Sequence, residues 1–363
     1  MKGPILTVNP GSSSLKLRLL GADDALLAER SADTRDMGDE LSDFLAAAPR
    51  PVAAGVRVVH GGSRFRAAIA VDEATADAIA ELSDLAPLHN PPALEAIRRL
   101  LRLHPQLPVV ACFDTAFFAT LPEPAAVYAV PWRWTEEWGL RRFGFHGLSH
   151  AYASRRAAEM LGRPPAELRI VTCHLGAGAS LAAVREGAAV DTTMGFTPME
   201  GLVMATRSGS VDPGAILWLQ RAKGLSAIQL EEALERHSGL LSLSGVSSGM
   251  GDVLSAAREG DQRAALAVDV YVHRLRALIA SMTAALGGLD VIVFTGGVGE
   301  NVAEVRSHTV AGLKFLGVAV DEARNREATP DCDVSARDSR ARTLVITARE
   351  DLEIAHQARA VLG

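Results

Sequence analysis

The feature that most constrains the fold of this chain is an internal repeat. The segment "ILTVNPGSSSLKLRLLG" (Ile5–Gly21) and the segment "RIVTCHLGAGASLAAVREG" (Arg169–Gly187) share a β-branched strand, a glycine- and serine-rich turn, and Ser-Leu at the start of a second strand. With one inserted residue, the alignment gives these equivalences: Thr7 with Thr172, Asn9 with His174, and Gly11 with Gly176. A repeat of this kind predicts two related halves, each built around a strand hairpin.

The two turns of the repeat favour phosphate binding. Their glycine and serine residues leave backbone N–H groups exposed and let an anion approach without a Cβ in the way. An ordinary tight hairpin is the alternative for either turn alone, because glycine dominates hairpin turns in general. Two related turns, one in each half, favour a phosphate chain gripped from both sides of a central cleft.

The rest of the chain predicts mixed α/β halves. Three apolar runs rich in Val, Ile and Phe are typical of buried strands: 56–62, 109–117 and 290–297. Four segments have helical spacing: 72–85, 150–162, 229–239 and 264–288. The last is long and apolar, but Asp269, His273 and two arginines interrupt it, which favours a core or dimer-forming helix over a membrane span.

Composition limits the classes of function. With 363 residues, 48% of them hydrophobic, the chain is long enough for two domains with buried cores. The net charge of -6 and the lack of a local basic patch argue against a nucleic-acid partner. The first residues, "MKGPILTVNP", do not resemble a signal peptide, and no apolar run reaches the roughly 18 residues of a membrane span. We therefore expect a cytoplasmic protein without a membrane partner.

Several side chains are candidates for binding an anion. Arg57 and Arg207 lie among small residues that leave a guanidinium reachable, although an isolated arginine is usually a surface residue or an ion-pair partner. Asp114 ends an apolar strand, where a carboxylate is costly unless it holds a cation or an arginine; a helix cap is the alternative. The stretch "FTGGVGEN" (Phe294–Asn301) follows a strand and opens a helix, as either a nucleotide-binding turn or a tight packing turn would.

The stretch "RRFGFHGLSH" sets His146 and His150 four residues apart, at the spacing of two metal ligands on a helix. It lacks the intervening glutamate of the metalloprotease motif, and no third ligand is evident, so we do not expect zinc. We expect His150 to pack or cap, and His146 to donate a hydrogen bond to charge that develops on a transferred group.

Ten strings, in order along nearly the whole chain, carry a resemblance to the acetate kinase family of the actin-like, Hsp70-like and sugar-kinase superfamily. They are "VNPGSSSLK", "RVVHGG", "APLHNPPALEAI", "CFDTAFFATLP", "RRFGFHGLSHAY", "TCHLGAGASLAAV", "DTTMGFTPMEGL", "TRSGSVDPGAI", "VFTGGVGENVAEVR" and "EDLEIA". The resemblance implies an α/β fold of two duplicated actin-like, ribonuclease H-like domains with a catalytic cleft between them. We expect residues 1–118 plus 353–363 to form a shortened N-terminal domain, and 119–352 the C-terminal domain with the nucleotide side and the dimerisation surface.

The activity that the resemblance implies is reversible transfer of the ATP γ-phosphoryl group to acetate, giving acetyl phosphate and ADP with Mg²⁺ or Mn²⁺. By this resemblance Asn9 and Glu350 are associated with the metal, and Asp114, His146 and Arg207 are catalytic. Asp114 is best cast as an orienter of Arg57 or of hydrated Mg²⁺, because acetate is already an ionised nucleophile. The family also implies a homodimer.

The resemblance further divides the binding residues by ligand. The acetate side comprises Arg57, Val59, Leu88, His89, Phe145 and Pro198. The nucleotide side comprises Ser14, Lys16, His174, Leu175, Gly176, Ala177, Gly178, Gly249, Met250, Gly251, Gly297, Val298, Gly299, Glu300 and Asn301. Val59, Leu88, Phe145 and Pro198 would form a small apolar pocket for the methyl group, with plain core packing as the alternative. One methylene there is worth about 1 to 3 kcal/mol, so propionate is expected to be a poorer substrate.

The sequence departs from the family pattern at four places. Ala177 replaces the asparagine of "HLGNG", and Gly249–Gly251 replaces an adenine-side string that carries an arginine. Arg349 stands where the family has asparagine, and Val56 where it has histidine. Only 47 residues, numbers 10 to 56, separate Asn9 from Arg57, fewer than is usual. The first two departures leave open another donor, such as pyrophosphate or a different nucleotide.

Two further alternatives come from the same superfamily. A regulatory or filament-forming relative would have little reason to keep Arg57, Asp114, His146, Arg207 and Glu350 together. A sugar kinase would need an aspartate base near a polyol site, which the apolar character of Val59, Leu88, Phe145 and Pro198 argues against.

Overall fold

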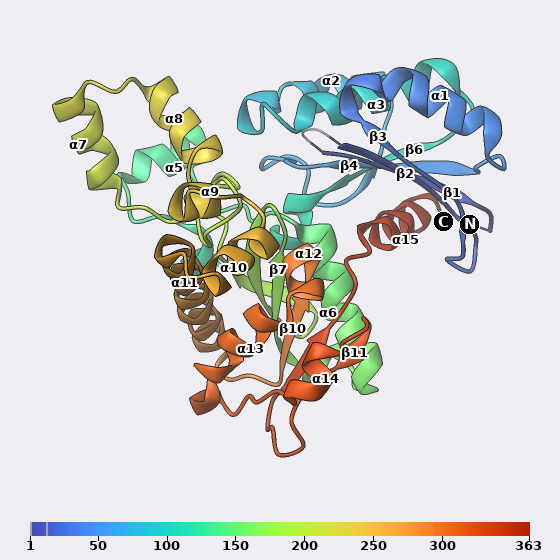
Figure 1. Ribbon diagram of the computed structural model, residues 1–363. Coiled ribbons are helices and arrows are strands. Elements are labelled where there is room, and N and C mark those ends of the chain that lie inside the picture. The colour runs from blue at the N-terminus through green and yellow to red at the C-terminus, as the bar shows by residue number, and fades with distance from the viewer. Residues whose placement is uncertain (1, 12–13) are drawn as a thin grey trace. The chain divides into compact units, whose positions relative to one another are not determined.

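The computed structural model describes residues 2–11 and 14–363, and it divides into two compact units (Figure 1). Unit 1 comprises Met1–Ala119, Phe145–Tyr152 and Arg349–Gly363, and unit 2 comprises Thr120–Gly144 and Ala153–Ala348. Ser12 and Ser13 of the first predicted phosphate turn lie outside the described residues. The predicted cleft between the halves stays a prediction.

A six-stranded mixed sheet with the strand order β3-β2-β1-β4-β6-β5 forms the centre of unit 1. β1 pairs antiparallel with β2 and parallel with β4, which in turn pairs parallel with β6. The strands are β1 (Ile5–Pro10), β2 (Ser14–Leu20), β3 (Leu26–Asp33), β4 (Ala53–Val58), β5 (Ile69–Ala70) and β6 (Val109–Phe113). The helices are α1 (Met37–Ala47), α2 (Glu73–Ala80), α3 (Asn90–Leu103) and α15 (Glu350–Leu362).

Each face of this sheet is covered by its own helices. Successive side chains of a strand point to opposite faces. Even-numbered residues of β1 and β4, such as Val8 and Val56, share a core with α1, α2 and α3. Odd-numbered residues, such as Ile5 and Ala53, belong to a second core with α15. In Figure 1, α1 to α3 accordingly lie on one side of the strands and α15 lies on the other.

The sheet of unit 2 repeats the topology of unit 1. Read in the corresponding direction, its order is β9-β8-β7-β10-β12-β11, with the same sequence of antiparallel and parallel pairings. Its strands are β7 (Arg169–Leu175), β8 (Ala179–Arg185), β9 (Ala188–Thr192), β10 (Val291–Thr295), β11 (Cys332–Asp333) and β12 (Arg342–Val345). Thr7 and its predicted equivalent Thr172 each donate a side-chain hydrogen bond to a carbonyl of the partner strand, at 3.2 and 3.4 Å. The predicted duplication is confirmed.

The long helix α11 (Gln262–Leu286) of unit 2 contacts β7, β8 and β9. Ten of its residues are buried, so of the two predicted alternatives, a core helix or a dimer-forming helix, the structure supports the core helix. No helix within 2–11 and 14–363 has the length and apolarity needed to cross a membrane. The other helices are α4 (Glu123–Ala126), α5 (Trp132–Trp138), α7 (Pro213–Lys223), α8 (Ala227–Arg236), α9 (Gly239–Ser244), α10 (Met250–Arg258), α12 (Gly296–Asn301), α13 (Ala303–Ala311) and α14 (Glu322–Arg326), while α6 (Gly147–Leu161) runs from unit 1 into unit 2.

The predicted elements differ from the structure mainly at their ends. The strand predicted over 109–117 stops at Phe113, because Asp114–Phe118 form a 3-10 turn, η3. The helix predicted over 150–162 begins three residues earlier, at Gly147. The helix predicted over 72–85 is α2, which Asp72 caps by accepting the Thr75 N–H, followed by the short turn Ser83–Leu85.

Candidate active site

Strand periodicity brings three predicted site residues to one place in unit 1. Asn9, Arg57 and Asp114 have the parity of the residues that face α15, and they lie at or just after the carboxyl ends of β1, β4 and β6. Glu350 is the first residue of α15. Open α/β sheets bind ligands at the carboxyl ends of their strands. The fold therefore collects four of the predicted residues at such an edge.

The four side chains form a connected cluster. Arg57 donates from Nε and Nη2 to Asp114 Oδ2, at 3.0 and 2.6 Å. Its Nη1 donates to Asn9 Oδ1 at 3.1 Å and lies 3.6 Å from Glu350 Oε2. Asn9 Nδ2 donates to the same Glu350 oxygen at 2.6 Å. The Arg57 guanidinium of β4 thus joins residues from β1, from the turn that follows β6 and from the distant helix α15.

Burial strengthens the electrostatic interactions between Arg57 and the two carboxylates of this cluster. The Arg57 side chain is 14% exposed and the Asp114 side chain 1%. Burial opposes the charge of Arg57, but the carboxylates of Asp114 and Glu350 outweigh it and raise the pKa of the guanidinium. Burial raises the pKa of Asp114, against the lowering effect of Arg57. Removing one partner of a buried ion pair leaves an uncompensated buried charge, which strongly destabilises the folded protein.

The oxygen atoms of this cluster fit a magnesium ion. Asp114 Oδ1 is buried without a hydrogen-bond partner among the described residues, and amide and carboxylate oxygens are the ligands that Mg²⁺ prefers. No group of three or more His, Cys, Asp or Glu within the described chain is arranged to hold a metal by itself. Mg²⁺ usually keeps several waters and binds through one or two carboxylates together with substrate phosphates.

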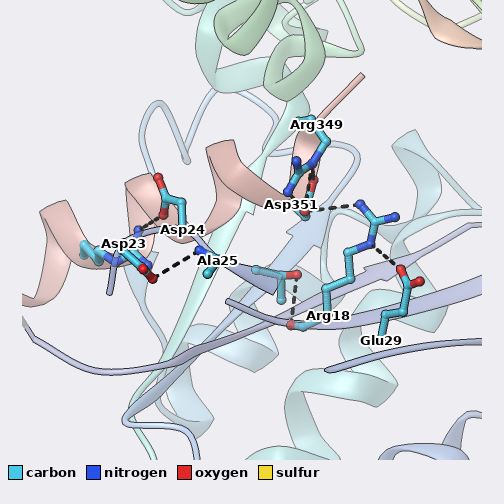
Figure 2. Close-up of polar contacts among 9 residues, drawn as sticks. Arg18, Asp23, Asp24, Ala25, Glu29, Arg349 and Asp351 are labelled. Carbon is cyan, nitrogen blue, oxygen red and sulfur yellow. Dashed lines mark hydrogen bonds and ion pairs between the residues drawn. The ribbon is translucent and has the colours of Figure 1, made fainter. Parts of the chain in front are cut away.

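The two residues that flank Glu350, Arg349 and Asp351, belong to an ion-pair network (Figure 2). Arg349, at the departure from the family's asparagine, donates to Asp351 from Nε at 3.0 Å and from Nη2 at 2.9 Å. Arg18 of β2 lies 3.2 Å from the same carboxylate and 3.3 Å from Glu29. Burial opposes ionisation of Asp351, but the two arginines outweigh it and lower its pKa. Arg349 therefore holds the turn that carries Glu350.

Lys16 and Ser14 lie on the hairpin strand beside this cluster. Lys16 is paired directly with Asn9 in the β1–β2 register, and both Ser14 and Lys16 are exposed. Gly11 closes the hairpin by donating its N–H to the Ser14 carbonyl at 2.7 Å. An exposed ammonium group on the strand next to Asn9 is well placed to meet an anion.

A buried amide holds the predicted acetate residues that follow β4. Asn90 is fully buried; it accepts the His60 N–H and donates to the His60 carbonyl, both at 3.0 Å. This reciprocal pair ties the turn after Val59 to the start of α3, where Leu88 and His89 are half-buried. Sequence reasoning missed Asn90, although "HNPP" places an amide at the first position of the helix.

Phe145 completes the apolar part of this region. It is 1% exposed, and its ring meets the His60 ring edge-on at 5.3 Å. Val59 is 5% exposed. Both side chains belong to unit 1, whereas Pro198, the fourth predicted residue, belongs to unit 2.

The two histidines of the "FHGLSH" stretch have different surroundings. His150 is fully buried in α6 and packs edge-on against Phe118 at 5.9 Å, as predicted for a packing residue. His146 precedes α6, and its backbone φ of 58° is in the left-handed region, which residues other than glycine rarely adopt. Such strain persists where the surrounding structure enforces it, commonly at functional sites.

The residue after His146 must be glycine. A Cβ on Gly147 would lie 1.9 Å from the Asp114 carbonyl oxygen, which is backbone. We expect Gly147→Ala to lower the free energy of unfolding by about 1 to 3 kcal/mol, the usual effect of overpacking, because α6 and η3 must move apart. Urea unfolding measures this. Gly251→Ala, at an open helical position, is the matched control and should be neutral or stabilising; equal losses in both variants would contradict the explanation.

In unit 2 the two predicted glycine turns meet. Gly296 has a φ of 78°, and a Cβ there would lie 2.9 Å from the Leu175 carbonyl oxygen. Glu300 Oε1 accepts the N–H groups of Gly296 and Ala348, at 2.9 and 2.8 Å. The Glu300 carboxylate therefore braces the turn of α12, and the backbone of 296–301 lies beside the turn of residues 175–178.

The other nucleotide-side residues offer mostly backbone. His174, the penultimate residue of β7, is half-buried and in register with Thr295 of β10. The Met250 side chain is buried at the start of α10, while Gly251 and Gly297 have open space where a side chain would be. Gly251 therefore has no side chain in the string where the family pattern carries an arginine.

Arg207 differs from Arg57 because it has no carboxylate partner among the residues that the structure describes. It lies in the segment Thr193–Asp212, which has neither helix nor strand. Its Nη1 donates to the Pro198 carbonyl at 3.3 Å, and no ion pair joins it to an acid within the described residues. Burial lowers its pKa, and Glu235 opposes this only in part. A partly desolvated guanidinium without a counter-ion is suited to a bound anion.

Comparison with known proteins agrees with this arrangement. The model of the acetokinase family matches residues 28–356. The chain is 52% identical to an acetate kinase of a Nostoc species over 303 residues, which cover 84% of this chain and 75% of the relative. A crystal structure of Porphyromonas gingivalis acetate kinase covers 99% of this chain and all of its own, at 35% identity and a TM-score of 0.92. A propionate kinase of Francisella tularensis matches over 99% and 100%, at 34% identity and 0.91. The fold of two duplicated α/β halves is shared with these enzymes, and the chain belongs to the acetokinase family.

Proposed function

We propose that the chain is an acetate kinase that transfers the γ-phosphoryl group of ATP reversibly to acetate. A carboxylate oxygen of acetate forms the new bond to the γ-phosphorus, and the bond from that phosphorus to the bridging oxygen breaks. The electron pair of the broken bond stays on ADP, so no proton has to be removed from the nucleophile. The family assignment and the relatives named acetate kinase support this class of phosphotransferase.

The observation that carries the proposal is the buried Arg57 cluster. Arg57 holds two carboxylates and an amide at the carboxyl edge of the unit 1 sheet. Its guanidinium is fixed in direction by Asp114, so it offers a preset fork to the carboxylate of acetate. Because acetate is already ionised, such alignment supplies most of what this reaction needs from the acceptor side.

His146 and Arg207 are proposed to stabilise the phosphoryl group during transfer. The Arg207 guanidinium lacks a carboxylate partner among the described residues, so its charge is available to the equatorial oxygens. His146 is held in a left-handed conformation beside Phe145 and can donate from its ring. Lys16 and the glycine backbones of 175–178 and 296–301 are proposed to contact the nucleotide phosphates.

Asn9, Asp114 and Glu350 are proposed to hold Mg²⁺, or Mn²⁺, through oxygen atoms and bound water. When bound, the ion neutralises phosphate charge on ATP. Asn9 and Arg57 also orient the Glu350 carboxylate, which keeps its oxygens directed into the cluster. The three cysteines, all described, are free thiols, and together with the need for ATP this supports a cytoplasmic location.

The activity can be tested by trapping acetyl phosphate with hydroxylamine. Acetate and Mg²⁺ are supplied with ATP, with GTP or with pyrophosphate, and the Arg207→Ala variant is the blank. Turnover with ATP that the blank lacks supports the proposal. Turnover with pyrophosphate alone would assign another donor, and no turnover with any donor would reject the enzyme.

The size of the methyl pocket can be tested at Val59. We expect Val59→Ala to raise kcat/KM for propionate relative to acetate about tenfold, because one methylene in an apolar site is worth roughly 1 to 3 kcal/mol. The ratio of the two kcat/KM values is the measurement. Val58→Ala is the matched control, since it loses the same methyl groups from the α3-side core. An equal change of the ratio in both variants would contradict a pocket at Val59.

We also propose a homodimer that forms through α7 and α8. No residue of α7 is buried, and Leu217, Trp218 and Ile228 are 59%, 47% and 76% exposed. The end of α7 is basic, with Arg221 and Lys223, whereas α8 carries three glutamates. The helices contact each other within unit 2 (Figure 1). A second copy can therefore match α7 with α8 in both apolar area and charge.

The proposed dimer predicts a strong effect of Trp218→Glu. A charge in the apolar centre of an interface should weaken association by about 30-fold or more, the effect of losing a residue that dominates binding. Light scattering during size-exclusion chromatography should show the wild type as a dimer and this variant as a monomer at micromolar concentration. Phe315→Glu, 69% exposed elsewhere in unit 2, should leave the dimer intact. A monomeric wild type would contradict the proposal.

A further inference from the structure

A polar cluster in unit 2 lies outside the residues assigned so far. The Glu200 carboxylate accepts the Tyr128 hydroxyl at 2.7 Å through Oε2 and Nη2 of Arg142 at 3.0 Å through Oε1. The Tyr128 hydroxyl in turn accepts the Phe196 N–H at 2.9 Å. The Arg142 guanidinium lies 5.4 Å from the centre of the Tyr128 ring. We call Tyr128, Arg142 and Glu200 the clamp.

The clamp holds the beginning of the segment Thr193–Asp212 at three points. Arg142 donates to the Thr193 carbonyl at 3.3 Å, Tyr128 binds the Phe196 amide, and Glu200 is itself part of the segment. The Phe143 N–H adds a backbone bond to the Gly195 carbonyl at 3.0 Å. A connection of this length without helix or strand is uncommon in a compact domain, so its position depends on such tethers.

Gly195 makes the clamp possible. A Cβ at this position would lie 1.8 Å from Glu200 Oε2 and 2.0 Å from the Tyr128 hydroxyl oxygen. Only a glycine lets the backbone pass this close to the two polar groups. The packing around the hydroxyl–carboxylate bond therefore leaves no room for any larger side chain.

The charge balance favours a fixed geometry. Burial and the hydrogen bond to Glu200 raise the pKa of Tyr128, so its hydroxyl remains a donor at neutral pH. Arg142 is 17% exposed and is the cation that pairs with Glu200. Asp191 lies near both charges; burial raises its pKa and Arg142 opposes this. Arg142 thus compensates the acidic groups around the segment.

The segment that the clamp holds ends in a second fixed stretch that carries Arg207. The Met204 N–H donates to the Arg207 carbonyl at 3.2 Å, and Leu202 and Met204 are buried. The Arg207 side chain donates to the carbonyl of Pro198, which lies between Phe196 and Glu200, the two residues of the segment that Tyr128 binds. Pro198 is two positions and Arg207 seven positions from Glu200 in the sequence. A displacement of Glu200 should therefore also displace Pro198 and Arg207.

We propose that Glu200, with Tyr128 and Arg142, is a positioning residue for phosphoryl transfer that acts by holding Arg207 in place. This inference rests on the proposed function, in which Arg207 contacts the transferred group. A displacement of about 1 Å of a catalytic group can cost 10²-fold in rate. Glu200→Ala should therefore lower kcat by about 10- to 100-fold and Tyr128→Phe by less, because Tyr128→Phe keeps the ring below Arg142.

The first test measures hydrogen–deuterium exchange of the intact protein. Tyr128→Phe removes the acceptor of the Phe196 N–H, so amides of residues 193–209 should exchange faster while those of β7 and β10 stay protected. Glu167→Gln, which alters an exposed pair with Arg163 at 3.8 Å, is the control and should change neither region. Unchanged exchange of 193–209 in Tyr128→Phe and Glu200→Ala overturns the proposal.

The second test asks whether Glu200 acts through Arg207. Transfer of radiolabelled phosphate is measured for Glu200→Ala, Arg207→Ala and the double variant. If Glu200 only positions Arg207, the double variant has the kcat of Arg207→Ala within about twofold, because coupled residues are not additive. Multiplied effects overturn the proposal. A wild type without turnover rejects the proposed function instead, and the exchange test still decides whether the clamp holds the segment.

Discussion

The Arg207→Ala variant should have a kcat for phosphoryl transfer to acetate about 10³- to 10⁵-fold below that of the wild type, the range measured for arginines that stabilise phosphoryl transfer. Its free energy of unfolding should stay close to the wild-type value. The reason lies in the bonding of the side chain. The Arg207 guanidinium donates only to the Pro198 carbonyl, at 3.3 Å, and weakly to Met204 Sδ, at 3.9 Å, and it pairs with no carboxylate among the described residues. The folded protein therefore loses little when the guanidinium is removed, and the reaction loses a charge.

Two further variants test whether the guanidinium of Arg207 itself is needed for the rate. Arg207→Lys keeps the charge but not the planar fork, so it should recover part of the lost rate. Arg185→Ala, an exposed arginine at the end of β8, should match the wild type in both kcat and stability. Steady-state kinetics with urea unfolding of the same samples separates the two effects. A large loss of stability in Arg207→Ala, with kcat within tenfold of wild type, would mean that Arg207 is a structural arginine.

Unlike Arg207→Ala, Asp114→Ala should strongly lower the free energy of unfolding. It leaves Arg57, 14% exposed, with Glu350 as its remaining carboxylate partner among the described residues, and breaking a buried ion pair from one side costs about 3 to 5 kcal/mol. The KM for acetate should also rise, because Asp114 sets the direction of the Arg57 guanidinium through two hydrogen bonds. Urea unfolding and acetate titration measure the two effects.

The double variant Arg57→Ala with Asp114→Ala provides the control. It removes both charges at once, so it should be more stable than the sum of the two single losses by at least about 1.5 kcal/mol, within the range of coupling between contacting residues. Asp114→Asn keeps an acceptor for Arg57 and should be less damaging than Asp114→Ala. Strictly additive losses would show that Arg57 and Asp114 do not stabilise each other.

Much of the fold followed from local patterns. The repeated hairpin predicted two related halves, and the two sheets have the same strand order and pairings. Alternation along β1, β4 and β6 places Asn9, Arg57 and Asp114 on one face, which period-two reasoning can anticipate. The ends of elements were less predictable. Asp114, predicted to lie in a strand, is the first residue of a 3-10 turn, and its carboxylate accepts hydrogen bonds from Arg57.

The sequence by itself determined the duplication, the α/β class, the membership of a family and the identities of Arg57, Asp114 and Arg207 as candidates, since these depend on local spacing and on residue type. Only the tertiary structure decided which charges are paired. Glu350 reaches Asn9 across 341 positions, Arg57 is held by two carboxylates, and Arg207 has none within the described residues. The physical reason is that hydrophobic periodicity acts within each element, whereas the partners of a charged side chain depend on where separate strand ends and loops converge.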